Sequence, residues 1–339
     1  MMNRPFMQAL ARALIVLAFV AASAQAKPSG TNAVAEKLTD GDNAGFGRIA
    51  TVAPTEGELQ VPGAVLHYTV FGEGKPLLLL AGGPGLRSEY LRPIVAGIGE
   101  GYRCVLLDQR GTGRSEADKA DATTINLDAF VQDLETLRAH LQIDRWVVLG
   151  HSWGGMLAMA YATRRAERIE ALVLADSGGP TLEFTKYFED NQLARLSLEE
   201  RELSNYWSEP KRQAADPQRA MYEQFRARAP SYVFDRKIAL LMIAGMSPQA
   251  FSAQVHNLIM ADLAARKYDL RSGLKNLALP VLIVAGRQDP IGESTAYEVR
   301  ESLPQASLKF IEKCGHFPWI EQPQSFFQAV TTFLKALPR

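Results

Sequence analysis

Residues 146–155 read WVVLGHSWGG, and the small-residue run MLAMA follows at 156–160. An apolar run, a serine flanked by glycines and a helix-forming segment together predict a buried strand, a sharp turn and a helix. In such a turn the serine hydroxyl is pushed out of the sheet, and the glycines leave room around it. Ser152 is therefore the candidate nucleophile. The alternative is a strand–turn–helix corner that needs small residues only for packing.

A serine hydroxyl near neutral pH needs a base within hydrogen-bonding reach and a third group that orients this base. Histidine is the natural base, and the five histidines are His67, His140, His151, His256 and His316. Local pattern favours structural roles for His67 and His140 and a solvated role for His256. The side chain of His151 is expected to leave the turn in a direction away from its neighbour Ser152.

His316 remains, and it lies in a loop after the last predicted strand, 308–312. Loops at the carboxyl ends of parallel strands gather at one edge of a sheet, so this histidine can reach a serine that follows another strand. His316 is the candidate base. A loop histidine without a catalytic role is the alternative.

The orienting acid has two candidates. Asp289 follows the predicted strand 280–285, and Asp176 follows the predicted strand 172–175. Both satisfy the chain order Ser, Asp, His. Asp289 is preferred because its strand directly precedes that of His316, which makes the two loops neighbours, and Asp176 stays open as the alternative.

A tetrahedral intermediate also needs two hydrogen-bond donors for its oxyanion. The backbone N–H of Trp153, at the start of the predicted helix, is one. The turn AGGPG at 81–85 follows a predicted strand at 76–80, and Gly83 is the candidate second donor. A purely structural turn is the alternative, and a phosphate-binding loop is disfavoured because Pro84 interrupts the glycines.

The first 26 residues have the layout of a secretory signal peptide. Arg4 and Arg12 precede an apolar run at 13–22, and an A-x-A site ends at Ala26. We expect cleavage after Ala26 and a secreted or periplasmic enzyme. The apolar run is too short for a transmembrane anchor, although an uncleaved tether stays open.

The chain has 37 basic and 37 acidic side chains, and loss of the signal peptide leaves a net charge of −2. Nucleic acids and anionic surfaces are therefore not expected as partners. No metal or organic cofactor is expected, because the proposed acyl chemistry needs none and a C-x-x-C pattern is absent.

The pattern of elements predicts one large α/β domain with an insertion. Residues 27–55 are expected to form a linker, and strands alternate with helices over 56–180 and 273–339. This alternation predicts a mainly parallel sheet with helices on both faces. Residues 181–272 show only amphipathic helical patterns with aromatics, so they are expected to form a helical cap above the serine.

Three segments resemble the proline iminopeptidase-like branch of the α/β-hydrolase superfamily. AGGPG at 81–85 resembles its H-G-G-P-G, DQRGTGRS at 108–115 is similar to its D-Q-R-G-x-G-R-S, and GHSWGG at 150–155 resembles its nucleophile turn. The resemblance extends over about residues 57–180 and 275–339. It implies the α/β-hydrolase fold, and by likeness 108–115 shapes the edge of the active site without a catalytic role.

The resemblance also implies a substrate class. Aminopeptidases of this branch hold the free amino group of the substrate with cap glutamates, and residues 220–223 resemble one such segment, which makes Glu223 a candidate substrate-binding residue. An exposed helical glutamate is the alternative, and a second such glutamate is not found. Ala81 replaces the histidine of the glycine motif.

In the strand order of the family, Cys104 and Cys314 are too far apart for a disulfide, so two buried free thiols are expected.

We therefore expect a serine hydrolase that works through an acyl-enzyme on a small molecule or short peptide. By resemblance an aminopeptidase is favoured. An esterase or lactonase would use the same residues, and a non-catalytic binding protein on this scaffold is a third possibility.

Overall fold

The computed structural model describes residues 54–244 and 246–338. The expected signal peptide and nearly all of the expected linker at 27–55 lie outside these ranges. Within them, every helix is too short or too polar to cross a lipid bilayer.

A nine-stranded sheet forms the centre of the described residues, in the order β1-β2-β4-β3-β6-β7-β8-β9, with β5 paired to β2. Its strands are β1 (Thr55–Val61), β2 (Ala64–Phe71), β3 (Lys75–Leu80), β4 (Tyr102–Leu107), β5 (Glu116–Ala117), β6 (Trp146–His151), β7 (Ile169–Ala175), β8 (Val281–Gly286) and β9 (Ala306–Ile311). All pairs that involve β2 are antiparallel, and the others are parallel. The predicted α/β class with a mainly parallel sheet is confirmed.

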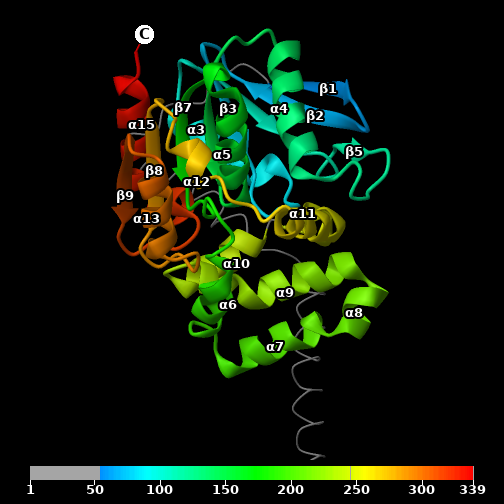
Figure 1. The fold of residues 1–339 in the computed structure, drawn as a ribbon. Helices are drawn as coiled ribbons and strands as arrows, with labels where there is room; N and C mark the ends of the chain where they lie inside the picture. The colour runs from blue at the N-terminus through cyan, green and yellow to red at the C-terminus, as the bar shows by residue number, and fades with distance from the viewer. Residues whose placement is uncertain (1–53, 245, 339) are drawn as a thin grey trace, which may run out of the picture. The chain divides into compact units, whose positions relative to one another are not determined.

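Helices cover both faces of this sheet (Figure 1). The helices outside the cap are α3 (Arg92–Ile98), α4 (Leu127–His140), α5 (Trp153–Arg165), α12 (Arg271–Leu274), α13 (Glu293–Ser302), α14 (Pro318–Glu321) and α15 (Pro323–Ala336). Leu78 and Leu80 of β3 belong to the core that holds α4 and α5, whereas Leu77 and Leu79 belong to the core that holds α3 and α15. Because neighbouring strand residues face opposite sides, the apolar run of β3 fills both layers.

A group of helices is inserted between β7 and β8, drawn in green to yellow in Figure 1. They are α6 (Thr185–Leu193), α7 (Leu198–Ser208), α8 (Pro210–Ala215), α9 (Pro217–Tyr232), α10 (Arg236–Ala244) and α11 (Ala253–Ala265). Backbone hydrogen bonds join this cap to two loops of the sheet. Ser252 N–H donates to the Gly85 carbonyl at 2.8 Å, and His316 N–H donates to the Tyr232 carbonyl at 2.7 Å. The cap is thereby fixed to the loops that carry the candidate site.

Both cysteines are buried and free of disulfides. Cys104 is in β4 and Cys314 follows β9. Burial raises the pKa of the Cys104 thiol to about 12 and also raises the pKa of Cys314. Both thiols therefore stay protonated at neutral pH and are poor nucleophiles.

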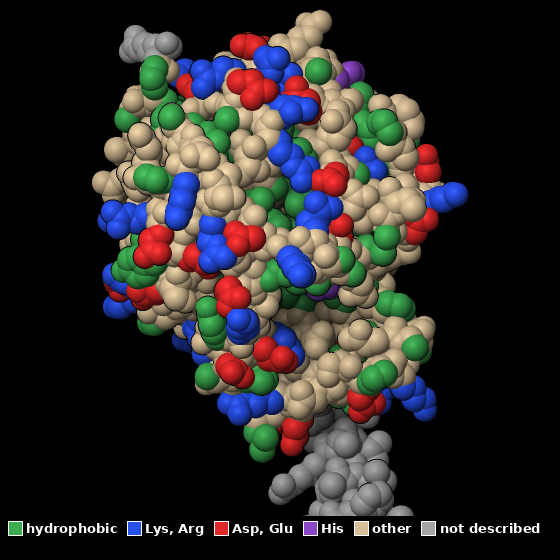
Figure 2. All heavy atoms as spheres, viewed as in Figure 1, with side chains coloured by type: hydrophobic (Ala, Val, Ile, Leu, Met, Phe, Trp, Pro, Cys, Tyr) green, Lys and Arg blue, Asp and Glu red, His purple; other side chains and the backbone are tan. Residues whose placement is uncertain are grey.

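Basic and acidic side chains are interspersed on the face of the molecule shown in Figure 2. This face carries no large area of one charge, which agrees with the equal numbers of basic and acidic residues in the sequence.

Candidate active site

Ser152 occupies the sharp turn between β6 and α5. Its backbone has a positive φ of 56° and a ψ of −120°, a strained conformation that is held by its neighbours. Ser152 N–H donates to the Ala175 carbonyl at 3.1 Å, and Gly178 N–H donates to the Ser152 carbonyl at 3.2 Å. A Cβ on Gly154 would overlap the Leu80 carbonyl. The turn therefore needs glycine where the sequence has it.

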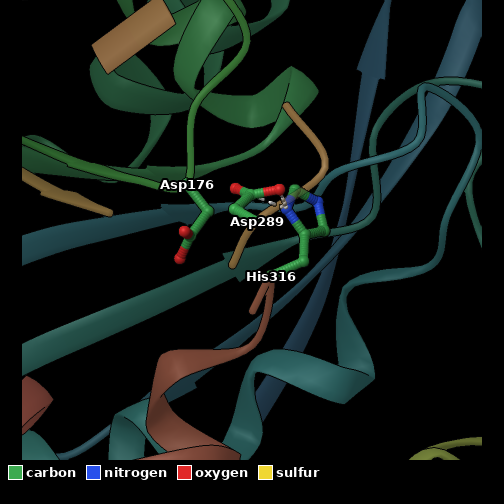
Figure 3. Close-up of side chains that lie close together, drawn as sticks. All are labelled: Asp176, Asp289 and His316. Atoms are coloured by element: carbon green, nitrogen blue, oxygen red, sulfur yellow. Dashed lines mark hydrogen bonds and ion pairs between the residues drawn. The ribbon is translucent and has the colours of Figure 1, made fainter. Parts of the chain in front are cut away.

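His316 and Asp289 meet at the carboxyl end of the sheet, as Figure 3 shows. His316 Nδ1 lies 3.0 Å from both carboxylate oxygens of Asp289. Ile291 N–H also donates to Asp289 Oδ1, at 2.9 Å. Since an ionised carboxylate only accepts, His316 carries its hydrogen on Nδ1 and keeps Nε2 free to accept a proton. Asp289 thus fixes the orientation of the imidazole.

Asp176, the alternative acid, follows β7 and lies on the far side of Asp289 from the imidazole (Figure 3). Its Oδ1 accepts a hydrogen bond from Gly286 N–H at 2.7 Å, whereas its buried Oδ2 has no partner among the described residues. Burial, and then the neighbouring Asp289, raise the pKa of Asp176 well above its usual value. These shifts favour the protonated form of Asp176, which makes no hydrogen bond to the histidine and does not replace Asp289 there.

Asp176, Asp289 and His316 offer ligand atoms within 4.8 Å of one another, a spacing that suits a cation. Two of these atoms are already hydrogen-bonded, since His316 Nδ1 donates to Asp289 and Asp176 Oδ1 accepts from Gly286. The raised pKa of Asp176 also disfavours the charged carboxylate that a cation would need. Hydrogen bonding accounts for the cluster.

Both candidate oxyanion donors border the same cavity as Ser152. Trp153 is the first residue of α5, so its backbone N–H has no acceptor within the helix. Gly83 has a φ of 113°, which a side chain would oppose. Gln109 connects the glycine turn at 81–85 to the first residue of α5. Its Nε2–H donates to the Ala81 carbonyl at 2.9 Å, and its Oε1 accepts from Trp153 Nε1–H at 2.8 Å.

His151 and Tyr90 form a hydrogen-bonded chain that sequence reasoning missed. His151 Nε2 lies 2.9 Å from the His316 carbonyl, which can only accept, so His151 carries its hydrogen there. Its Nδ1 then accepts from the Tyr90 hydroxyl at 2.8 Å, and that hydroxyl accepts from Gly82 N–H at 2.7 Å. Burial, and then His316, lower the pKa of His151 well below its usual value. Neutral His151 thus joins the glycine loop to the histidine loop.

Glu321 is a further residue whose role the sequence did not indicate. Its Oε1 accepts from Gly315 N–H at 2.9 Å, and its Oε2 accepts from Phe234 N–H at 2.6 Å. The side chain is nearly buried, and burial raises its pKa. Glu321 therefore fixes the histidine loop to the segment that follows α9.

The DQRGTGRS segment holds the edge of the site through buried polar contacts. Asp108 Oδ1 accepts from Ser88 N–H at 2.9 Å, and its Oδ2 accepts from Arg114 N–H at 3.0 Å. Arg110 makes a buried ion pair with Asp133. None of these contacts involves Ser152 or His316, and they hold the loop that carries Gln109.

A cavity of about 330 Å³ lies between the cap and the sheet and is bordered by both Ser152 and His316. Its walls are mostly apolar, with contributions from Met156, Phe184, Phe188, Met221, Phe225, Phe251 and Met260. Several cap aromatics thus belong to a ligand-sized space. The cavity is large enough for a small substrate and too small for a folded protein.

His256 and Glu223 differ from their sequence-based interpretations. His256 was expected in solvent but borders the cavity, where its Nδ1 lies 3.3 Å from the Pro84 carbonyl. The helical pattern of α11 could not show that this helix packs on the glycine loop. Glu223 does not border the cavity, and its carboxylate is paired with Arg226 at 2.9 Å. The structure therefore brings Ser152, His316, Asp289, Gly83 and Trp153 together but leaves Glu223 outside.

A sequence profile of the α/β-hydrolase fold matches residues 75–323. The chain belongs to this family. A proline iminopeptidase from Heyndrickxia coagulans is 26% identical over 297 residues, which cover 84% of this chain and 99% of that protein. The resemblance to the proline iminopeptidase-like branch is confirmed, and the protein is a hydrolase.

Two solved structures share the fold. A proline iminopeptidase-related protein from Thermus thermophilus has a TM-score of 0.67 and 24% identity, and covers 84% of this chain and 99% of its own. An esterase from Exiguobacterium antarcticum has a TM-score of 0.61 and 20% identity, and covers 83% of this chain and 100% of its own. The fold is therefore common to hydrolases of different substrate classes, and the substrate has to be argued from the cavity.

Proposed function

We propose that this protein is a serine hydrolase that forms an acyl-enzyme on Ser152. The observation that carries the proposal is the pairing of His316 with Asp289 in the cavity that Ser152 also borders. This pairing leaves the imidazole Nε2 as the proton acceptor. The positive φ of Ser152 supports the proposal, because strain of this kind concentrates at functional turns.

In the proposed mechanism, His316 removes the hydroxyl proton of Ser152 as the oxygen attacks the carbonyl carbon of the substrate. The backbone N–H groups of Gly83 and Trp153 stabilise the oxyanion. The imidazolium then protonates the leaving group, and the acyl group stays on Ser152. A water molecule, deprotonated by the same histidine, releases the acid and restores the serine.

The cavity supports a small ester or amide with a mainly apolar body as substrate. Peptides with a free N-terminal residue form the second candidate class, and the relatives named proline iminopeptidase favour it. A direct comparison decides between these classes. Chromogenic aminoacyl anilides and short acyl esters are compared by kcat/KM, with Ser152→Ala as the control.

Turnover of at least one class by the native enzyme and its loss in Ser152→Ala are expected. Anilide cleavage without ester cleavage would favour the peptidase class. Full turnover by Ser152→Ala would contradict an acyl-enzyme on Ser152.

We also propose that the enzyme is exported, on the strength of the signal-like sequence at 1–26. Mass spectrometry of the protein from its native host should find Lys27 as the first residue. An N-terminus at Met1 would contradict export by cleavage.

A further inference from the structure

Six polar side chains of the cap border the cavity: Thr185, Gln192, Gln224, Arg228, Tyr232 and His256. Three of them are in contact with one another, because Gln192 of α6 is hydrogen-bonded to Arg228 and contacts Tyr232, both of α9. We call these three the donor cluster. Tyr232 also packs on the catalytic histidine, with 5.4 Å between the ring centroids of Tyr232 and His316. The cluster is therefore placed to touch a substrate held at Ser152.

Arg228 places a positive charge on the cap side of the cavity. Among the described residues, Arg228 is the only lysine or arginine that borders the cavity, and no aspartate or glutamate does. Its Nη2–H donates to Glu189 at 3.1 Å, but the side chain of Glu189 is 64% exposed whereas that of Arg228 is 17% exposed. Water screens the carboxylate better than the cation, so the interior side of this pair is positive.

Gln192 adds a donor that lacks a well-placed acceptor. The side chain is fully buried, and its Oε1 accepts from Arg228 Nη1–H at 3.2 Å. This contact fixes the orientation of the amide, because an arginine can only donate. Its Nε2 faces the Tyr232 hydroxyl, and this contact lowers the pKa of Tyr232, but its geometry is too poor to satisfy the buried amide. A buried N–H without a well-placed partner is unfavourable, and an acceptor on a ligand would satisfy it.

Tyr232 remains a donor as well. Burial raises the pKa of its hydroxyl to about 12, so the proton stays in place at neutral pH. The cluster therefore presents N–H and O–H groups and a positive charge. An ammonium group would meet repulsion there, whereas a carboxylate or carbonyl oxygen would meet donors.

We propose that the donor cluster binds a hydrogen-bond acceptor oxygen of the substrate, best a carboxylate, so that the enzyme prefers acidic or neutral acyl groups over those with a free amine. This inference rests on the proposed function, since it concerns the acyl group that Ser152 receives. It also makes this cavity unlike a site that recognises a peptide by its N-terminal amine.

The test uses three p-nitrophenyl esters with the same six-carbon chain: hexanoate, the adipate monoester and 6-(trimethylammonio)hexanoate. In native enzyme, kcat/KM should fall in the order adipate, hexanoate, trimethylammonio ester. The free energy of a hydrogen bond to a charged group corresponds to a difference of roughly tenfold or more in kcat/KM between the adipate ester and the trimethylammonio ester. A trimethylammonio ester that reacts fastest would overturn the inference.

Arg228→Gln should remove the preference for adipate, mainly through KM. Arg226→Gln is the matched control, because Arg226 is on the same helix, is 46% exposed and does not border the cavity. The control should keep the native order of the three esters. If Arg228→Gln folds and also keeps this order, the inference is wrong.

Gln192→Met serves if Arg228→Gln does not fold, since methionine keeps the volume and removes the N–H donors. It should weaken adipate selectivity, and an unchanged order of the esters would again overturn the inference. Fluorophosphonate labelling of Ser152 separates the two proposals. Labelling with the wrong charge preference contradicts the donor cluster alone, whereas failure of both labelling and turnover contradicts the serine hydrolase.

Discussion

Asp289 and Asp176 lie at adjacent strand ends, and only Asp289 bonds to the candidate base. Asp289→Asn should lower kcat on the order of 10⁴-fold, because an amide favours the wrong tautomer of His316. Asp176→Asn should lower kcat by less than about tenfold, since Asp176 makes no hydrogen bond to His316 and an amide oxygen can still accept from Gly286 N–H. Steady-state kinetics of both variants test this. A larger loss of kcat in Asp176→Asn than in Asp289→Asn would mean that Asp176 is the acid that orients His316.

The raised pKa of Asp176 predicts a pH-dependent stability. The unfolded carboxyl loses its proton near pH 4, whereas the folded one keeps it to a higher pH. The folded state therefore binds more protons in this window, and its stability falls as pH rises toward the folded pKa, by at most about 1.4 kcal/mol per pH unit. The Tm of Asp176→Asn relative to native protein should rise from pH 5 to pH 8. A constant difference would mean that Asp176 is ionised.

Tyr90 is expected to position the glycine loop through its hydroxyl. Tyr90→Phe leaves Gly82 N–H and His151 Nδ1 without their partner. The free energy of unfolding should fall by about 1–3 kcal/mol. The loss in kcat should exceed the change in KM, because the oxyanion donor in this loop would be less well placed. Denaturant titration and kinetics measure the two effects, and native values for both would refute this role.

At the scale of elements, the sequence predicted the strand, the turn and the helix around Ser152 because their signals are local. The apolar run, the glycines and the small helical residues lie within 15 positions, 146–160. Boundaries were less accurate. β7 begins at Ile169, three residues before the predicted strand at 172–175, because pairing with β6 extends it.

The start of α5 depends on its close approach to β3. A Cβ at Gly154 would overlap the Leu80 carbonyl, which is backbone and cannot turn aside. Gly154→Ala should therefore displace the helix and lower the free energy of unfolding by about 1–3 kcal/mol. It should also slow the labelling of Ser152. Unchanged thermal stability together with an unchanged labelling rate would show that the turn tolerates the shift.

At the scale of the whole molecule, the order of the strands predicted that Asp289 and His316 would be neighbours, but other contacts between distant loops had no signal in the sequence. The roles of Tyr90, His151 and Glu321 come from hydrogen bonds between loops that only the folded chain brings together. The helical pattern located the cap in the sequence, but it did not predict which side chains of the cap helices face the cavity. For this reason His256 was expected in solvent although it borders the cavity, and the sequence left Glu223 open between a substrate contact and a surface glutamate.

The most direct test of the account is the covalent state of Ser152 during turnover. After rapid mixing with a p-nitrophenyl ester and acid quenching, intact-protein mass spectrometry should find one added acyl group, and peptide mapping should place it on Ser152. The adduct should be absent from Ser152→Ala. Turnover without any adduct, together with resistance of Ser152 to a fluorophosphonate, would contradict the acyl-enzyme mechanism.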